Sequence, residues 1–171
     1  MLRRFAATAV VLAALPALGL AAPSPTPAAL CVANYSNAAW GLVYQGLVIG
    51  SDGSLRPYEL GDFKGEDAKT ILLGEDKERL AALLGRPARG SVAPQDLPEK
   101  QALIEEAAGG PYGPRRSVAR DKGAFTVTCY TPEGRPVLIT EDGDWQQENR
   151  SPAALELRAW LETLDPRFKI R

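Results

Sequence analysis

The sequence offers many acidic and basic side chains for chemistry, but no histidine. Its 171 residues include 20 Lys and Arg, 21 Asp and Glu and no His, which excludes Ser-His and Cys-His nucleophile pairs and every metal site that uses imidazole. Neither the phosphate-cradling G-x-x-x-x-G-K motif nor the nucleophile motifs S-x-x-K and G-x-S-x-G occur. Any catalysis would therefore depend on carboxylates, Lys, Tyr or hydroxyl groups.

Three carboxylates stand close together at Glu141, Asp142 and Asp144, around a glycine that predicts a turn. Oxygen ligands on a turn suit a hard cation, and two close carboxylates suit acid-base hydrolysis of a glycosidic bond. The ligand pattern of an EF-hand loop is absent, so the sequence favours a solvated turn and predicts no metal or other cofactor. Trp145 beside the acids is interpreted as an anchor against the core, with a sugar platform as the alternative.

A basic cluster occupies a loop rich in Gly and Pro, at Arg115, Arg116, Arg120 and Lys122. Such a cluster suits an anionic polymer of the cell envelope or an acidic partner. A solvated loop balanced by Asp121 is the favoured interpretation, because surface charge runs are common. The whole chain has a formal charge of -1, which argues against a nucleic-acid binder.

The first 21 residues have the plan of a secretory signal peptide. Arg3 and Arg4 are followed by an uncharged apolar stretch over residues 5–20 and by small residues that predict cleavage after Ala21. An uncleaved membrane anchor is the alternative, but Pro16 and the small residues favour cleavage. The predicted mature chain has no stable membrane span and is secreted or periplasmic.

Two cysteines, Cys31 and Cys129, follow the signal. Export to an oxidising compartment and an even count predict one disulfide between them. Two buried thiols are one alternative. Lipid modification of Cys31 is another, although bulky Leu30 stands where lipoprotein signals carry a small residue. Residues 22–29, A-P-S-P-T-P-A-A, predict an extended linker, and residues 30–171 a single globular domain.

The N-terminal half of this domain predicts strands joined by turns. Residues 31–35 indicate a short strand, and residues 40–49 indicate a strand that is buried on both sides because it is apolar on both pleat faces. Residues 50–54 form a dense turn signal, after which residues 55–60 return antiparallel. Pro57 cannot donate to a strand ladder and places this returning strand at a sheet edge.

Three helices and a second hairpin complete the predicted elements. The helices cover residues 75–84, residues 96–108 with Asp96 as cap, and a last segment that Ser151 caps and that stops at Asp165. Residues 125–130 and 137–140 alternate as an antiparallel hairpin. This order predicts an α+β fold, in which three helices pack against an antiparallel sheet of about four to five strands.

Two groups of residues near the ends of the predicted domain carry a family resemblance. They are Asn37-Ala38-Ala39-Trp40-Gly41 with Gly46, Ile49, Asp52-Gly53 and Tyr58, and Gly143-Asp144-Trp145 with Asn149, Ala153, Ala154, Leu157 and Trp160-Leu161. In these residues the chain resembles a family of small exported bacterial proteins, some of them lipid-anchored, that has no known activity. The resemblance implies export and residence in the cell envelope, and it transfers no catalytic residue.

The functional hypothesis is therefore a non-catalytic module that binds a protein or another envelope component. The alternatives are a hydrolase that uses Glu141, Asp142 or Asp144 and an inhibitor-like module with a rigid loop near the disulfide. Contacts are expected on the segments that the fold does not need, which are residues 50–54, 115–122 and 141–149. The last segment ranks first, because it combines Trp145 with fixed charges.

Overall fold

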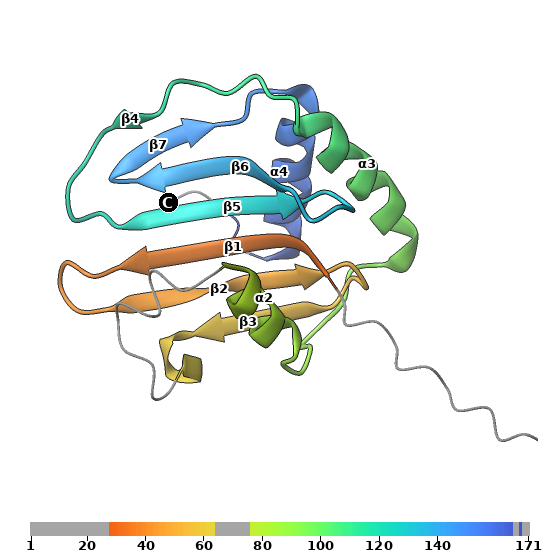
Figure 1. The fold of residues 1–171 in the computed structure, drawn as a ribbon, viewed down its shortest axis with the longest axis horizontal. Helices are drawn as coiled ribbons and strands as arrows, with labels where there is room; N and C mark the ends of the chain where they lie inside the picture. Colours follow the sequence, from red (N-terminus) through yellow and green to blue (C-terminus); the bar gives the residue numbers. More distant parts are fainter. Residues whose placement is uncertain (1–27, 64–75, 166–167, 169–171) are drawn as a thin grey trace, which may run out of the picture.

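The computed structural model describes residues 28–63, 76–165 and 168, and it shows an α+β fold with one antiparallel sheet and helices on both of its faces (Figure 1). The predicted signal peptide and residues 22–27 of the predicted linker lie outside the described residues. The strands are β1 (Ala29–Asn37), β2 (Val43–Gly50), β3 (Leu55–Glu59), β4 (Arg116–Ser117), β5 (Ala124–Tyr130), β6 (Pro136–Gly143) and β7 (Trp145–Glu148). The helices are α2 (Asp76–Leu84), α3 (Leu97–Ala107) and α4 (Pro152–Leu164), with short 3-10 turns at Leu60–Phe63 and Pro94–Asp96.

The sheet has seven strands in the order β3-β2-β1-β5-β6-β7-β4, more than the four to five that the sequence predicts. The two unexpected strands are β4 and β7, which fall in segments expected to be loops. Their residues are almost all polar, so they lack the alternation of apolar and polar positions that marks a half-buried strand. β7 forms because it pairs with β6, and β4 forms because it pairs in turn with β7.

The N-terminal hairpin differs from its prediction in where the strand begins. The segment 40–49 is not one buried strand, because β2 starts at Val43 and Trp40 lies in the hairpin tip with 89% of its surface exposed. The positive φ of Gly41, 116°, reverses the chain there. β1 begins at Ala29, the last residue of the predicted linker, and continues well beyond the expected short strand.

The edge at β3 is closed to further strand pairing, as the position of Pro57 predicts. The backbone N–H of Leu55 donates to the carbonyl of Gly90 at 2.9 Å, and the N–H of Arg89 donates to the carbonyl of Leu55 at 2.8 Å. The N–H of Glu59 donates to Oδ2 of Asp62 at 2.8 Å. Pro57, between these two residues, has no N–H to offer. The free edge is thereby protected against pairing with another chain.

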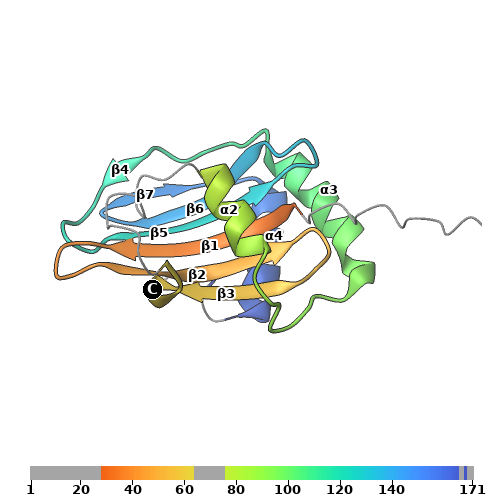
Figure 2. The same cartoon turned by 60° about the horizontal axis from the view of Figure 1, so that its bottom comes forward.

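The helices cover both faces of the sheet and enclose two hydrophobic cores, one on each face (Figure 2). The α4 face packs against α3 and α4 and holds the larger core, which includes Ala33, Leu47, Ile49, Ile104, Val127, Ile139, Leu157 and Leu161. The α2 face has a smaller core beneath α2, made by Val32, Tyr44, Val48, Tyr58, Phe63, Leu83 and Leu84. This second core covers the half of the sheet formed by β1, β2 and β3. No described helix lies over β5, β6 and β7 on this face.

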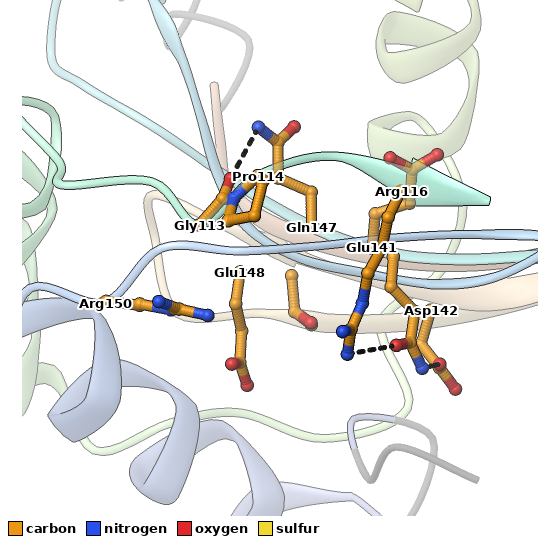
Figure 3. Close-up of a pocket in the computed structure, with 10 residues that line it drawn as sticks. Gly113, Pro114, Arg116, Glu141, Asp142, Gln147, Glu148 and Arg150 are labelled. Carbon is orange, nitrogen blue, oxygen red and sulfur yellow. Dashed lines mark hydrogen bonds between the residues drawn. The ribbon is translucent and has the colours of Figure 1, made fainter. Parts of the chain in front are cut away.

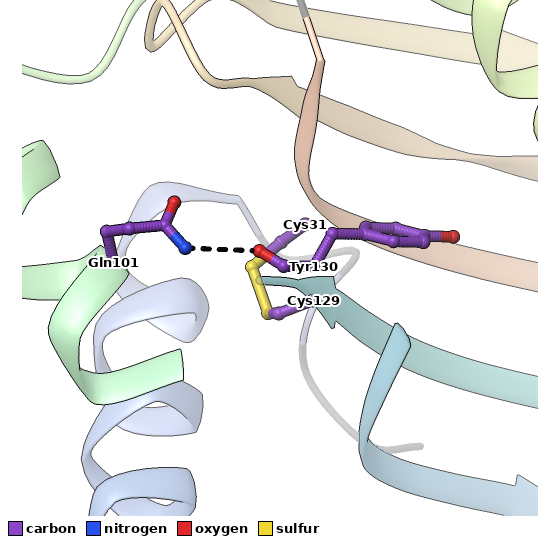
Figure 4. Close-up of a disulfide and its surroundings, with 4 residues drawn as sticks. All are labelled: Cys31, Gln101, Cys129 and Tyr130. Carbon is purple, nitrogen blue, oxygen red and sulfur yellow. Dashed lines mark hydrogen bonds between the residues drawn. A yellow bond between two sulfur atoms is a disulfide. The ribbon is translucent and has the colours of Figure 1, made fainter. Parts of the chain in front are cut away.

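The predicted disulfide between Cys31 and Cys129 is present and joins the two central strands, β1 and β5, at one end of their ladder (Figure 4). The two residues are directly opposite each other in the β1–β5 ladder, with Cα atoms 3.9 Å apart. Both side chains are completely buried. Beside the disulfide, Nε2 of Gln101 donates to the carbonyl of Tyr130 at 3.2 Å, which ties α3 to the end of β5.

The three predicted helices are confirmed, with one difference in how they start. Ser151 caps α4, since its Oγ accepts the N–H of Ala154 at 3.1 Å. Asp96 precedes α3 but its side chain makes no capping hydrogen bond. No helix within the described ranges is long and apolar enough to cross a membrane.

Replacing Ser151 with Ala is expected to lower the free energy of unfolding by about 1 kcal/mol, because the N–H of Ala154 loses its partner. Urea titration of the purified variant measures this loss. The exposed serine Ser91 provides the control, since Ser91→Ala should stay within about 0.5 kcal/mol of the wild type. Equal stability of both variants would show that the cap contributes nothing.

Candidate functional site

The structure brings together two of the three segments expected to make contacts. In the β4–β7 ladder, Arg116 pairs with Gln146, and Ser117 pairs with Trp145. The backbone N–H of Lys122 donates to Oδ1 of Asp144 at 2.8 Å, so the loop after β4 is fastened to the β6–β7 turn. Residues 115–122 and 141–149 therefore form one continuous region at the β4 edge of the sheet. The third segment, residues 50–54, joins β2 to β3 in the other half of the sheet (Figure 1).

The three neighbouring carboxylates do not form one site, because only Asp144 lies in the β6–β7 turn, whereas Glu141 and Asp142 lie on the strand β6. Glu141 and Asp142 are consecutive residues of β6, and consecutive side chains of a strand point to opposite faces. Glu141 pairs with Arg115, whereas Asp142 pairs with Lys122 at 3.0 Å and accepts Nε2 of Gln146 at 2.7 Å. Within the described ranges, no group of three or more acidic or sulfur ligands is placed to hold a metal ion.

Asp142 lies in a polar pocket of about 270 Å³ on the α4 face (Figure 3). Arg116 and Asp142 lie toward one end of the pocket, and Glu148 and Arg150 lie toward the other. The carboxylate oxygens already have donors, since Glu148 accepts Nη1 of Arg158 at 2.7 Å and Asp142 is held by Lys122 and Gln146. The carboxylates of this pocket are therefore held in a network of polar contacts, which rigidifies the edge of the sheet.

Trp145 lies on the α2 face, where Arg115 is stacked over its ring. The guanidinium of Arg115 makes two hydrogen bonds to Glu141, from Nε at 2.7 Å and from Nη2 at 2.8 Å. Its Cζ atom lies 4.6 Å from the centroid of the Trp145 ring, a cation-π contact. The hydrogen bonds that Arg115 donates to Glu141 raise the pKa of Arg115 above its usual value, so the stacked group keeps its positive charge.

The interpretation of Trp145 as a buried anchor is wrong, because 44% of its surface is exposed. No described helix covers this half of the α2 face, so the indole has no core to enter. Arg120, in the loop between β4 and β5, is also exposed. Within residues 141–149, Trp145 is thus the residue that presents a large apolar surface to solvent.

A shallow depression lies next to Trp145 and Arg115 on the same face. It has a volume of about 390 Å³ and is lined by Tyr112, Thr128, Pro136, Leu138 and Gln147. Tyr112 is 42% exposed and forms a backbone bridge with Asn149, just after β7. Thr128 and Leu138 are direct partners in the β5–β6 ladder.

We call this surface the open face. It consists of Tyr112, Arg115, Thr128, Pro136, Leu138, Glu141, Trp145 and Gln147. The sequence points to Arg115, Glu141 and Trp145, and Gln147 falls within the predicted contact segment 141–149. Tyr112, Thr128, Pro136 and Leu138 are not predicted. The polar alternation of β5, with Thr126 and Thr128 facing away from the core, marks the exposed side of that strand. No comparable signal in the sequence marks Tyr112.

No protein-family model matches the chain, and no curated protein or solved structure matches it either. We therefore infer its function from the geometry of the open face.

Proposed function

We propose that the chain is an exported, non-catalytic binding module that contacts a component of the cell envelope through the open face. The observation that carries this proposal is the half-exposed indole of Trp145, over which Glu141 holds the guanidinium of Arg115. Trp, Tyr and Arg are the residues most often responsible for binding energy at protein interfaces. The open face provides one of each, with Trp145 on β7 and with Tyr112 and Arg115 in the segment that runs beside β7.

The arrangement is organised for binding before a partner arrives. Arg115 is a long side chain that would lose rotamer freedom on binding, but its two hydrogen bonds to Glu141 already fix it above the indole. An aromatic ring has only two side-chain torsions to order. Binding to such a surface costs less conformational entropy than binding to mobile side chains.

Export is supported by two features of the chain. The N-terminal sequence has the plan of a secretory signal. The fully buried disulfide joins two central strands, and disulfides persist mainly in oxidising compartments. Residence in the cell envelope follows from the family resemblance alone and is part of the proposal.

The two alternatives have less support from the geometry. A carboxylate hydrolase needs an acid and a base that face one gap, whereas Glu141 and Asp142 lie on opposite faces and each is paired with a cation. An inhibitor-like module needs a protruding loop that the disulfide braces. Among the described residues, the most exposed aromatic side chain is Trp40, which lies beyond the end of β1 that is far from Cys31.

Replacing Trp145 with Ala is expected to weaken capture of the partner without unfolding the protein. Loss of a central aromatic contact costs about 2 kcal/mol or more of binding free energy, which is roughly 30-fold in Kd. The free energy of unfolding should fall by only about 1 kcal/mol, because the indole is half exposed. The measurements are capture from envelope extract on the immobilised protein and urea titration of the same variant.

Trp40→Ala is the matched control, since this exposed indole lies on the β1–β2 tip and outside the open face. It should leave capture unchanged. Undiminished capture by Trp145→Ala would contradict the proposal. A stability loss of about 3 to 5 kcal/mol, typical of a fully buried aromatic residue, would contradict it as well.

A further inference from the structure

Two exposed aromatic side chains, Trp145 and Tyr112, lie at opposite ends of the edge of the open face that β7 forms. Trp145 begins β7, and Tyr112 is bridged to Asn149, four residues further along the chain. A strand rises by about 3.3 Å per residue, so the two backbone positions are roughly 13 Å apart along the strand. Gln147 lies midway between them on the same side as Trp145, because side chains two residues apart in a strand share a face.

The described residues of the open face carry no uncompensated charge. The guanidinium of Arg115 is neutralised by the two hydrogen bonds to Glu141, and the remaining members are uncharged. The neighbouring cations Arg116 and Lys122 are bonded to Gln146 and Asp142, on the other side of the sheet. A strongly anionic or cationic ligand would therefore meet no unpaired opposite charge among the residues of the open face.

The chemistry of the surface is also unsuited to a purely apolar partner. Leu138 and Pro136 provide an apolar floor, but Thr128 and Gln147 lie beside them in the same depression. Covering a hydroxyl or an amide without giving it a hydrogen bond is costly. The ligand must offer uncharged hydrogen-bonding groups and apolar faces in alternation.

The shape of the surface favours an extended ligand. The depression is shallow and open, with aromatic residues beyond it at Trp145 and within it at Tyr112, whereas small ligands are usually enclosed in deep pockets. An elongated molecule that lies along the direction of β7 can contact both rings at once.

We infer that the open face binds a neutral carbohydrate chain, a conclusion that rests on the proposed binding function and specifies its ligand. The C–H faces of two sugar rings lie against the rings of Trp145 and Tyr112, since aromatic side chains offer broad apolar surfaces with a polar tip. The hydroxyl groups between them bond to Thr128, to the Arg115–Glu141 pair and to Oε1 of Gln147, whose Nε2 already donates to the carbonyl of Gly113 at 3.3 Å. These groups together supply both donors and acceptors.

The test is co-sedimentation of the full purified protein with insoluble chitin and cellulose, which are neutral, and with calcium alginate gel, which is acidic. We expect the protein to be retained on at least one of the two neutral polysaccharides. We expect no specific retention on alginate. Raising the salt concentration should not release the protein, because a neutral ligand has no charge to screen.

Trp145→Ala and Tyr112→Ala should each reduce retention about tenfold or more. Gln147→Leu keeps the size of the side chain, removes its hydrogen-bonding groups and should reduce retention in the same way. Trp40→Ala is the matched control and should bind like the wild type. Circular dichroism of each variant verifies that it is folded, so loss of retention can be assigned to the open face.

The inference is overturned by absence of retention on both neutral polysaccharides, by retention that salt abolishes, or by an equal loss in Trp40→Ala. These outcomes are distinct from failure of the proposed function. If capture from envelope extract depends on Trp145 but the protein is not retained on chitin or cellulose, the inference of a carbohydrate ligand is wrong. The proposed binding function would still be supported. Failure of both experiments would overturn both.

Discussion

Removal of the disulfide is expected to destabilise the protein by roughly 4 to 5 kcal/mol. Cys31 and Cys129 are 98 residues apart in the sequence, and closing a loop of about 100 residues is worth about 4.7 kcal/mol in the chain-entropy model. At about 2 to 4 °C per kcal/mol for a protein of this size, the melting temperature should fall by on the order of 10 to 15 °C. Calorimetry of the Cys31→Ala/Cys129→Ala variant without reductant measures the change.

Dithiothreitol separates the effect of the disulfide from the effect of the substitutions. It should lower the melting temperature of the wild-type protein and leave that of the double variant unchanged. If it alters neither, and alkylation of the purified wild-type protein counts two free thiols, the disulfide does not form.

Loss of the buried amide of Asn149 is expected to have the second largest effect. Only 1% of this residue is exposed, and its side chain joins two helices. Nδ2 donates to the carbonyl of Ala107 at the end of α3, at 2.8 Å, and Oδ1 accepts the N–H of Ser151 before α4, at 3.1 Å. The variant Asn149→Ala leaves both backbone groups without their partner. At about 1 to 3 kcal/mol for each, the expected loss is roughly 2 to 6 kcal/mol.

Urea titration measures this loss, and an unchanged slope against urea would show that the folded state stays equally compact. Gln147→Ala, two residues earlier on β7, is the control. Its side chain is only partly buried, so it should lose less than about 1 kcal/mol. A loss for Asn149→Ala as small as for Gln147→Ala would contradict the role of Asn149 as the link between the helices.

The elements with strong local signals could be predicted from the sequence. The apolar alternation of β5 and the proline after Ser151 act within a few residues, so the strand and α4 are where the pattern indicates. The disulfide followed from an even number of cysteines and the export signal. The strand β7, with the sequence W-Q-Q-E, has no local signal of its own and forms because β6 offers an edge.

Only part of the candidate site can be predicted from the sequence. Residue type alone marks Glu141, Arg115 and Trp145 as candidates. The sequence predicts a turn at Glu141 and Asp142, however, and a turn gives no sign that the two side chains lie on opposite faces of a strand. The exposure of Trp145 depends on how far α2 extends over the sheet, which is a tertiary property. Tyr112 joins the surface through one backbone bridge to Asn149, a contact that only the fold creates.

The central claim is that the open face is the contact surface, and nuclear magnetic resonance of the isotope-labelled protein tests it most directly. Amide and indole shifts would be recorded while the component captured from envelope extract is added. We expect the largest shifts at Leu138, Gln147 and the indole of Trp145, with α3 and α4 unaffected. Shifts confined to the Trp40 tip, or to the Asp142 pocket on the α4 face, would contradict the claim.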